Sequence, residues 1–125
     1  MASIVHFQKA VQALENSLKA YKSESDTEKK KMIRDSVIQR FEFCVELSWK
    51  TAVKVLGLTT SAPKPAIRDM ARAGLIANPD KWFQFIEARN KTSHAYDEKI
   101  AEEVYQVAES YLKEGQSLLM KLEEQ

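Results

Sequence analysis

The sequence predicts an all-α protein, an antiparallel bundle of four main helices with one additional short helix. Three observations support this fold class. Apolar residues recur at spacings of three and four along most of the chain, and no segment alternates with the period of two that is typical of a strand. The 3 Gly and 3 Pro in 125 residues leave few places for tight turns. We expect a single domain spanning residues 1–125, since this length accommodates one core.

The first two helices have recognisable starts. Ser3 can cap the first helix, and Ser25 and Glu28 form a capping box for the second, which continues to a left-handed stop at Gly57. About thirty residues at 1.5 Å each make a helix of about 45 Å, longer than a small core needs. We therefore expect the second helix to overhang and meet a second protomer. The predicted buried stripes are Ile4, Phe7, Val11, Leu14, Leu18 and Tyr21 in the first helix, and Ile33, Val37, Phe41, Cys44, Ser48, Ala52 and Val55 in the second.

A proline-rich break at residues 59–65 separates the second helix from the next two. A short helix is predicted from about Pro65 to Ala73, closed by Gly74. Asn78, followed by a proline and an aspartate, has the pattern of a helix start. The helix that it begins is predicted to run toward Arg89.

Asp97 is the predicted cap of the last helix. Gly115 lies inside this helix and is expected to be a weak spot, because glycine costs about 1 kcal/mol relative to alanine in a helix interior. The predicted buried stripe of this helix is Ile100, Val104, Val107, Tyr111, Leu118 and Leu122.

Composition narrows the classes of function. The formal net charge of +1 provides no global field that would attract nucleic acid or an acidic membrane, so any such binding must come from a local patch. The single cysteine, Cys44, forms no internal disulfide and is expected to be a small buried apolar residue. With no leader pattern and no membrane-spanning run, we expect a cytoplasmic protein. Two His, one Cys and no clustered carboxylates predict neither a metal site nor a cofactor.

The segment from Arg89 to Tyr96 is the candidate active site, because it places a permanent cation, an imidazole and a phenol between two helices. Histidine exchanges protons near neutral pH, and arginine offers a planar fork of donors suited to phosphate. Phosphodiester chemistry is therefore the first hypothesis. On an unbroken helix, Arg89 and His94 would lie roughly 140° apart. Either the helix loosens near residues 91–93, or the cleft is wide and shared between protomers.

The pattern Arg89-x-x-x-x-His94-x-Tyr96 resembles the signature of HEPN proteins that are encoded beside minimal nucleotidyltransferases, also called nucleotidyltransferase substrate-binding proteins. The likeness extends over most of the chain, through the segments Phe41–Lys50, Pro63–Arg68 and Ala73–Ile76. The resemblance implies a HEPN-like bundle that forms a homodimer with two motifs in one cleft. Many members of this family are metal-independent endoribonucleases, so the resemblance also implies this activity.

The resemblance also implies a role for each motif residue. His94 and its dimer mate would share the work of general base and general acid, and Arg89 would stabilise charge on the phosphorane oxygens. Asn90 or Ser93 would orient the phosphate or the imidazole through a hydrogen bond. Tyr96 would accept AMP from the nucleotidyltransferase, which would silence the nuclease.

Lys64, Arg68 and Arg72 recur every four residues on the short helix and are a candidate basic ridge for an RNA backbone. A solvated face balanced by Asp69 explains the same pattern at least as well. Four aromatic residues are candidates for stacking on bases: Trp49, Trp82, Phe83 and Phe85. For Trp49, its helical spacing with apolar neighbours favours core packing.

Two functions from different classes remain open at the level of sequence. In the first, the chain is an endoribonuclease toxin restrained by its nucleotidyltransferase partner. In the second, it is a non-catalytic subunit that docks the nucleotidyltransferase and binds a nucleotide in the Arg/His cleft. The intact pair of Arg89 and His94 favours the first.

Overall fold

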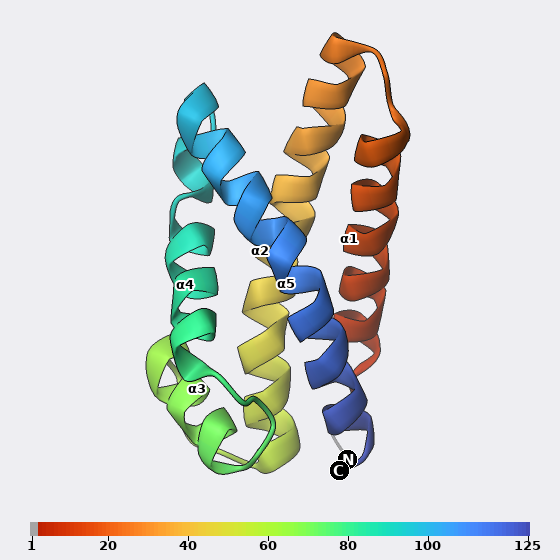
Figure 1. Cartoon of the computed structure of the whole chain (residues 1–125). Helices are drawn as coiled ribbons and strands as arrows, with labels where there is room; N and C mark the ends of the chain where they lie inside the picture. Colours follow the sequence, from red (N-terminus) through yellow and green to blue (C-terminus); the bar gives the residue numbers. More distant parts are fainter. Residues whose placement is uncertain (1–2) are drawn as a thin grey trace.

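The computed structural model describes residues 3–125, and its main helices run alternately up and down with both chain ends at the same end of the bundle (Figure 1). The predicted fold class is confirmed: within residues 3–125 there are helices and turns but no strand. A short helix, α3, packs against α2 and α4 at the lower end. The elements are α1 (Val5–Ser23), α2 (Thr27–Leu56), α3 (Pro63–Arg72), α4 (Pro79–Asn90), the 3₁₀ turn η1 (Thr92–His94) and α5 (Glu98–Glu123).

Two predicted helix caps are one residue off. The residue before α1 is Ile4 rather than Ser3, although the Ser3 hydroxyl still accepts a hydrogen bond from the first amide of the helix at 3.2 Å. At α2, Asp26 rather than Ser25 is the cap, and its carboxylate accepts from the amide of Lys29 at 3.0 Å. A carboxylate here also complements the positive end of the helix dipole, which a serine hydroxyl does not.

The other helix ends follow local rules closely. Gly57 ends α2 in the left-handed conformation with φ 67°, as predicted. Asn78 and Asp97 cap α4 and α5 through their side chains, also as predicted. Helix α3 begins two residues earlier than predicted, at Pro63, since proline is well suited to a first helical position. Gly74 follows this helix with φ 78°.

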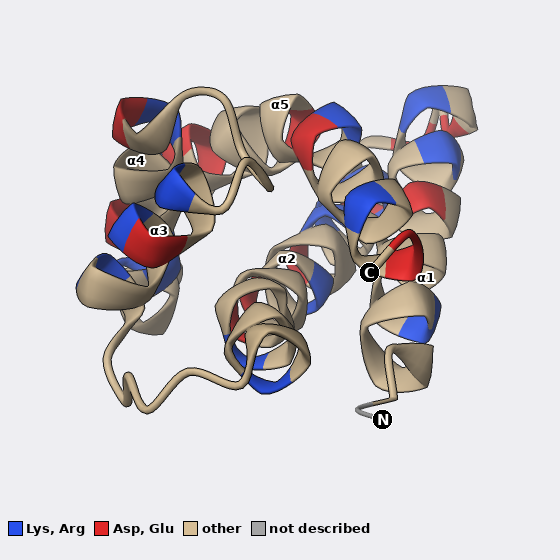
Figure 2. Ribbon diagram, turned by 90° about the horizontal axis from the view of Figure 1, so that it is seen from below, with Lys and Arg blue, Asp and Glu red and all other residues tan. Residues whose placement is uncertain are grey.

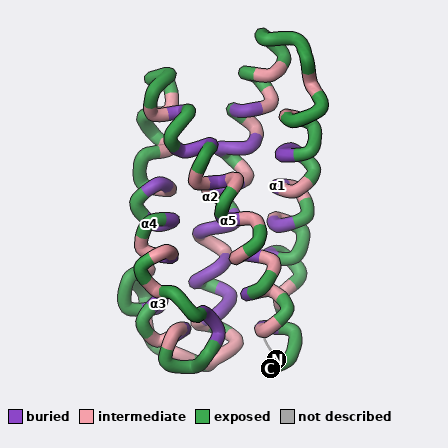
Figure 3. The backbone as a smooth tube through the Cα atoms, viewed as in Figure 1, coloured by how far each residue is buried: buried purple, intermediate pink, exposed green. Residues whose placement is uncertain are grey.

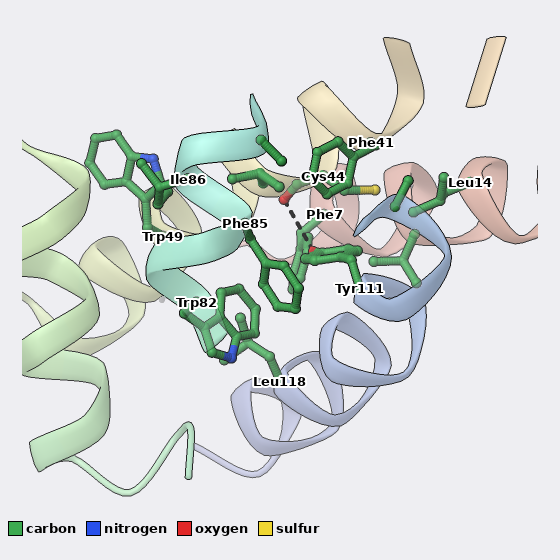
Figure 4. Packing of buried hydrophobic residues seen from close by; sticks show 14 of the residues in the cluster. Phe7, Leu14, Phe41, Cys44, Trp49, Trp82, Phe85, Ile86, Tyr111 and Leu118 are labelled. Carbon is green, nitrogen blue, oxygen red and sulfur yellow. Dashed lines mark hydrogen bonds between the residues drawn. The ribbon is translucent and has the colours of Figure 1, made fainter. Parts of the chain in front are cut away.

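The core is centred on Tyr111 of α5, which is fully buried. The rings of Phe41, Trp82 and Phe85 meet its ring edge to face, at centroid distances of 5.7, 5.7 and 5.2 Å (Figure 4). These residues come from α2 and α4, so one tyrosine joins three helices. Edge-to-face pairs of this kind contribute about 0.5–1.5 kcal/mol each beyond their buried area.

The phenol of Tyr111 is satisfied inside the core by α2. Its oxygen lies 2.5 Å from the Ser48 hydroxyl and donates to the Cys44 carbonyl at 3.3 Å. Burial raises the pKa of Tyr111 well above its usual value, so the phenol stays neutral. Cys44 is buried as expected, and burial raises the pKa of its thiol to about 12.

Gly115 has a packing role that its sequence context does not reveal. A Cβ atom at this position would lie 2.7 Å from two ring atoms of Tyr111. Glycine is therefore the residue that lets the tyrosine ring lie against its own helix. The prediction that Gly115 is a weak spot in α5 is therefore corrected: glycine lowers the helix propensity here, but it allows the close packing of the Tyr111 ring.

Burial follows the predicted stripes with a few displacements (Figure 3). In α5, Ile100 and Val107 are only half-buried, because the buried face is shifted toward small residues that let the helices approach. In α1 and α2, the half-buried members of the predicted stripes lie at or near the helix ends. The buried residues of α5 are Ala101, Val104, Tyr105, Ala108, Tyr111, Gly115, Leu118 and Leu122.

Candidate functional site

The candidate motif spans a change of backbone geometry at the end of α4. The α-helix stops at Asn90, and a 3₁₀ turn, Thr92–His94, follows it. The Thr92 hydroxyl donates to the carbonyl of Arg89 at 2.8 Å, which satisfies one of the free carbonyls of the helix end. The helix therefore does loosen near residues 91–93, which was the first of the two alternatives. Because it ends between Arg89 and His94, the two side chains are not held roughly 140° apart on one continuous helix.

Arg89 is paired with two carboxylates of α2. Its Nε lies 2.9 Å from Oε1 of Glu46, and its Nη2 lies 3.5 Å from Oε2 of Glu42. The Nε contact is an ion pair that is not aligned as a hydrogen bond. Lys50 meets the same Glu46 at 3.2 Å. We call Glu42 and Glu46 the carboxylate clamp, because they hold the guanidinium between α4 and α2.

His94 and Tyr96 are exposed beyond the clamp. Their rings lie edge to face with centroids 6.2 Å apart, and Tyr96 is 86% exposed. Within residues 3–125 the imidazole ring has no hydrogen bond or ion pair. Both side chains are therefore open to a substrate or a modifying enzyme.

A cleft of about 600 Å³ separates the motif segment from α2. One wall is the middle of α2, and the other is formed by η1 and the residues that follow it. Glu42 of the clamp and the motif residue Tyr96 both line this cleft. Its lining residues are Asp35, Ser36, Ile38, Gln39, Glu42, Thr92, Ala95 and Tyr96.

The start of α5, just after the motif, is also tied to α2. The nearly buried Arg34 donates from both terminal nitrogens to the Glu98 carboxylate, at 3.0 and 2.8 Å. The hydrogen bond to Glu98 raises the pKa of Arg34, and the same bond lowers the pKa of Glu98. Glu98 is the first residue of α5, so this pair fixes the end of the motif segment.

The remaining predicted site residues do not all gather here. Asn90 and Ser93 lie in the motif segment, and both are exposed, Asn90 at the end of α4 and Ser93 in η1. Lys64 and Arg68 lie on α3, at the opposite end of α4 from the motif, and neither lines the cleft (Figure 1). Positive and negative residues are interspersed along the helices, and Arg72 pairs with its neighbour Asp69 at 3.0 Å (Figure 2).

The suggestion that the aromatic residues stack on bases is wrong for three of the four. Trp49, Trp82 and Phe85 are buried in the core, as helical spacing indicated for the first of them. Phe83 is half-buried, and the Arg68 guanidinium lies 5.6 Å from its ring centroid. Arg68 thus packs on an aromatic ring of α4 in this structure.

Three residues of the site were missed by reasoning from sequence: Glu42, Glu46 and Arg34. A signal existed for the first two, because they lie four residues apart on one helical face, with Lys50 completing the series. Nothing local marks them as partners of Arg89, since that contact joins α2 to α4. Arg34 resembles any other cation of the charged start of α2.

Two further features of residues 3–125 concern metals and membranes. No group of three or more His, Cys, Asp or Glu side chains in this range is arranged to hold a metal ion. None of the helices in the described part of the chain combines the length and the apolar character needed to cross a bilayer.

The fold and the motif together define a class: an all-helical bundle with an Arg/His/Tyr motif at the junction of its last two helices. Residues 2–124 match the family described as "Nucleotidyltransferase substrate binding protein like". The chain belongs to this family, and the resemblance found in the sequence is confirmed.

Individual relatives agree with this assignment. A protein of Haemophilus influenzae named "Probable ribonuclease HepT" is 36% identical over an alignment of 93 residues that covers 68% of this chain and 64% of the relative. This chain therefore matches a little under two thirds of that relative's length. A solved Haemophilus influenzae structure, described as revealing the fold of a substrate binding domain of a nucleotidyltransferase, is 27% identical, with a TM-score of 0.88 over 97% of this chain and 99% of that one. A solved structure from Thermus thermophilus is 26% identical, with a TM-score of 0.80 over 93% of this chain and 98% of that one.

Proposed function

We propose that this chain is the HEPN partner of a minimal nucleotidyltransferase and cleaves RNA without a metal ion, as the toxin of a two-component pair. The nucleotidyltransferase is the antitoxin and silences the nuclease by transferring AMP to Tyr96. One observation carries this proposal: Tyr96 lines a cleft, His94 is exposed in the same segment, and Arg89 is held at the start of that segment. The family match and the ribonuclease named among its relatives support it.

The proposed reaction is the attack of a ribose 2′-oxygen on the adjacent phosphorus, with departure of the 5′-oxygen of the next nucleotide. One imidazole removes the 2′-hydroxyl proton, and a second protonates the leaving oxygen. Each such proton transfer contributes roughly 100- to 10,000-fold to a rate. The Arg89 guanidinium stabilises the charge on the non-bridging oxygens. The products are a 2′,3′-cyclic phosphate and a 5′-hydroxyl.

Two imidazoles require two protomers, because each chain supplies one His94. The exposed face of α2 supports a homodimer. Met32 is 71% exposed and Phe43 is 52% exposed, and both are large apolar side chains on the helix that lines the cleft. Helix α2 has 30 residues and apolar groups on several sides, as expected for a helix that meets partners on more than one face.

Silencing follows from the position of Tyr96. Its phenol oxygen attacks the α-phosphate of ATP on the nucleotidyltransferase, pyrophosphate leaves, and the phenol proton passes to solvent. The attached AMP adds bulk and negative charge to a residue that lines the cleft. It therefore competes with RNA phosphate for Arg89.

The test is cleavage of RNA by the purified chain in excess EDTA. His94→Ala and Arg89→Ala are expected to abolish cleavage while the helical circular-dichroism signal is retained. His6→Ala is a matched control, because His6 is an exposed histidine on α1. Activity that is lost on chelation and restored by magnesium would contradict the proposed reaction class.

A second function is favoured by the family description itself: a non-catalytic subunit that docks the nucleotidyltransferase and binds a nucleotide in the cleft. It predicts that the chain binds a nucleotide and its partner but leaves RNA intact. Expression of the chain alone separates the two functions, because only a toxin stops growth.

A further inference from the structure

We propose that the two carboxylates of the clamp have different tasks: Glu46 is a positioning residue that orients Arg89, and Glu42 occupies the place that an incoming phosphate takes. This inference rests on the proposed function, since the phosphate is that of an RNA backbone. It makes Glu42 a stand-in anion that leaves Arg89 when the substrate arrives.

The contacts of Glu46 are those of a fixed support. It lies 2.9 Å from Arg89 Nε, the nitrogen nearest the side-chain stem, and it does not line the cleft. Lys50 holds it from the other side at 3.2 Å. A carboxylate that pairs with the guanidinium at Nε leaves its two terminal nitrogens free to form a paired contact with a phosphate.

The contacts of Glu42 are those of an exchangeable ligand. It lies 3.5 Å from Arg89 Nη2, too far for a strong hydrogen bond, and its side chain lines the cleft. Within residues 3–125 this ion pair is its only one, whereas Glu46 has two cationic partners. An anion that replaces Glu42 would meet Arg89 from the cleft side.

The charges around Arg89 explain why the different contacts of Glu42 and Glu46 matter for binding a phosphate. Arg89 and Lys50 together balance the clamp, and Asp35 adds a further carboxylate to the cleft. Arg89 reaches Glu42 through Nη2 at 3.5 Å, and within residues 3–125 neither of its terminal nitrogens forms a hydrogen bond. A phosphate can therefore use Nη1 and Nη2 together, and it displaces only the weaker of the two carboxylate contacts.

The experiment measures the affinity of a 2′-O-methyl RNA oligonucleotide, which cannot be cleaved, by fluorescence anisotropy at fixed salt. Glu42→Gln is expected to bind about two- to fivefold more tightly than wild type, the range of an exposed ion pair. Glu46→Gln is expected to bind more weakly by a similar factor, although it also removes a negative charge. The control is Glu87→Gln, since Glu87 is exposed on α4 and has no ion pair within residues 3–125.

A spectroscopic measurement separates positioning from a general structural effect. The Nε–H signal of Arg89 is observed by ¹⁵N NMR, assigned by its loss in Arg89→Lys, and followed during titration with inorganic phosphate. Because the Nε atom is buried and faces the Glu46 carboxylate, this proton is expected to exchange slowly with water in wild type and in Glu42→Gln. In Glu46→Gln it is expected to exchange faster at an unchanged melting temperature.

The outcomes distinguish this inference from the proposed function. Equal affinities of Glu42→Gln and Glu87→Gln, or Glu46→Gln binding as tightly as wild type, would overturn the division of tasks even if the chain cleaves RNA. The expected order of affinities in a chain that never cleaves RNA would support the clamp and reject the nuclease.

Discussion

Arg34 of α2 donates two hydrogen bonds to Glu98, the first residue of α5, at 3.0 and 2.8 Å. Arg89, at the other end of the motif segment, is paired with Glu42 and Glu46 of the same α2. Helix α2 thus holds both ends of the segment that carries His94. The cleft lies between these two attachments.

The pair of Arg34 and Glu98 is expected to stabilise the folded protein at neutral pH and to lose this effect in acid. The hydrogen bond to Arg34 lowers the pKa of Glu98 below its usual value in the folded state. A lowered acid pKa stabilises the fold above the unfolded value, and this contribution is lost as the pH falls through the folded value. We expect Glu98→Gln to unfold at a lower urea concentration than wild type at neutral pH. The difference should shrink as the pH falls below about 4, because the carboxylate of Glu98 is then increasingly protonated and its pair with Arg34 is lost. A difference that is the same at both pH values would contradict the assignment.

The packing of Gly115 predicts that alanine destabilises the protein at this position, although alanine has the higher helix propensity. Gly115→Ala gains about 1 kcal/mol of propensity, but its Cβ would lie 2.7 Å from the Tyr111 ring. Overpacking of a core costs about 1–3 kcal/mol, so we expect a lower melting temperature. Ser110→Ala, at an exposed position of α5, should leave it unchanged or raise it. Stabilisation by Gly115→Ala would show that the ring moves aside freely.

The proposed homodimer is tested at Phe43, which is 52% exposed on α2. Phe43→Glu would place a charge in an apolar interface, and we expect a monomer in light scattering with the helical signal intact. Met120→Glu is the matched control, because Met120 is 64% exposed on α5, and it should leave the dimer unchanged. A wild-type chain that is strictly monomeric at micromolar concentration would reject the shared cleft.

The proposed modification is tested at Tyr96. The wild type, incubated with its nucleotidyltransferase, ATP and magnesium, should gain mass in AMP-sized steps and lose nuclease activity. Tyr96→Phe removes only an exposed hydroxyl, so it should fold and cleave normally and escape silencing. Intact-mass spectrometry of both proteins decides the matter. Equal labelling of the two, or no labelling with a demonstrably active partner, would favour the nucleotide-binding function.

Local features of the sequence determined the fold class and most helix ends. Gly57, Asn78 and Asp97 were correctly assigned because a cap depends on the backbone within three or four residues of it. Where two neighbouring polar residues compete, as Ser25 and Asp26 do, the prediction chose Ser25 and was wrong by one residue. The motif of Arg89, His94 and Tyr96 was also visible, because its residues are close in sequence.

The tertiary structure decided what each of these residues contacts. The pairing of Arg89 with Glu42 and Glu46 depends on how α4 packs against α2, and no local spacing encodes that angle. The same holds for Gly115, whose lack of a side chain has meaning only because the Tyr111 ring lies over it. Helix periodicity determines which face of a helix is buried, whereas the partners of that face are set by the packing of helices distant in sequence.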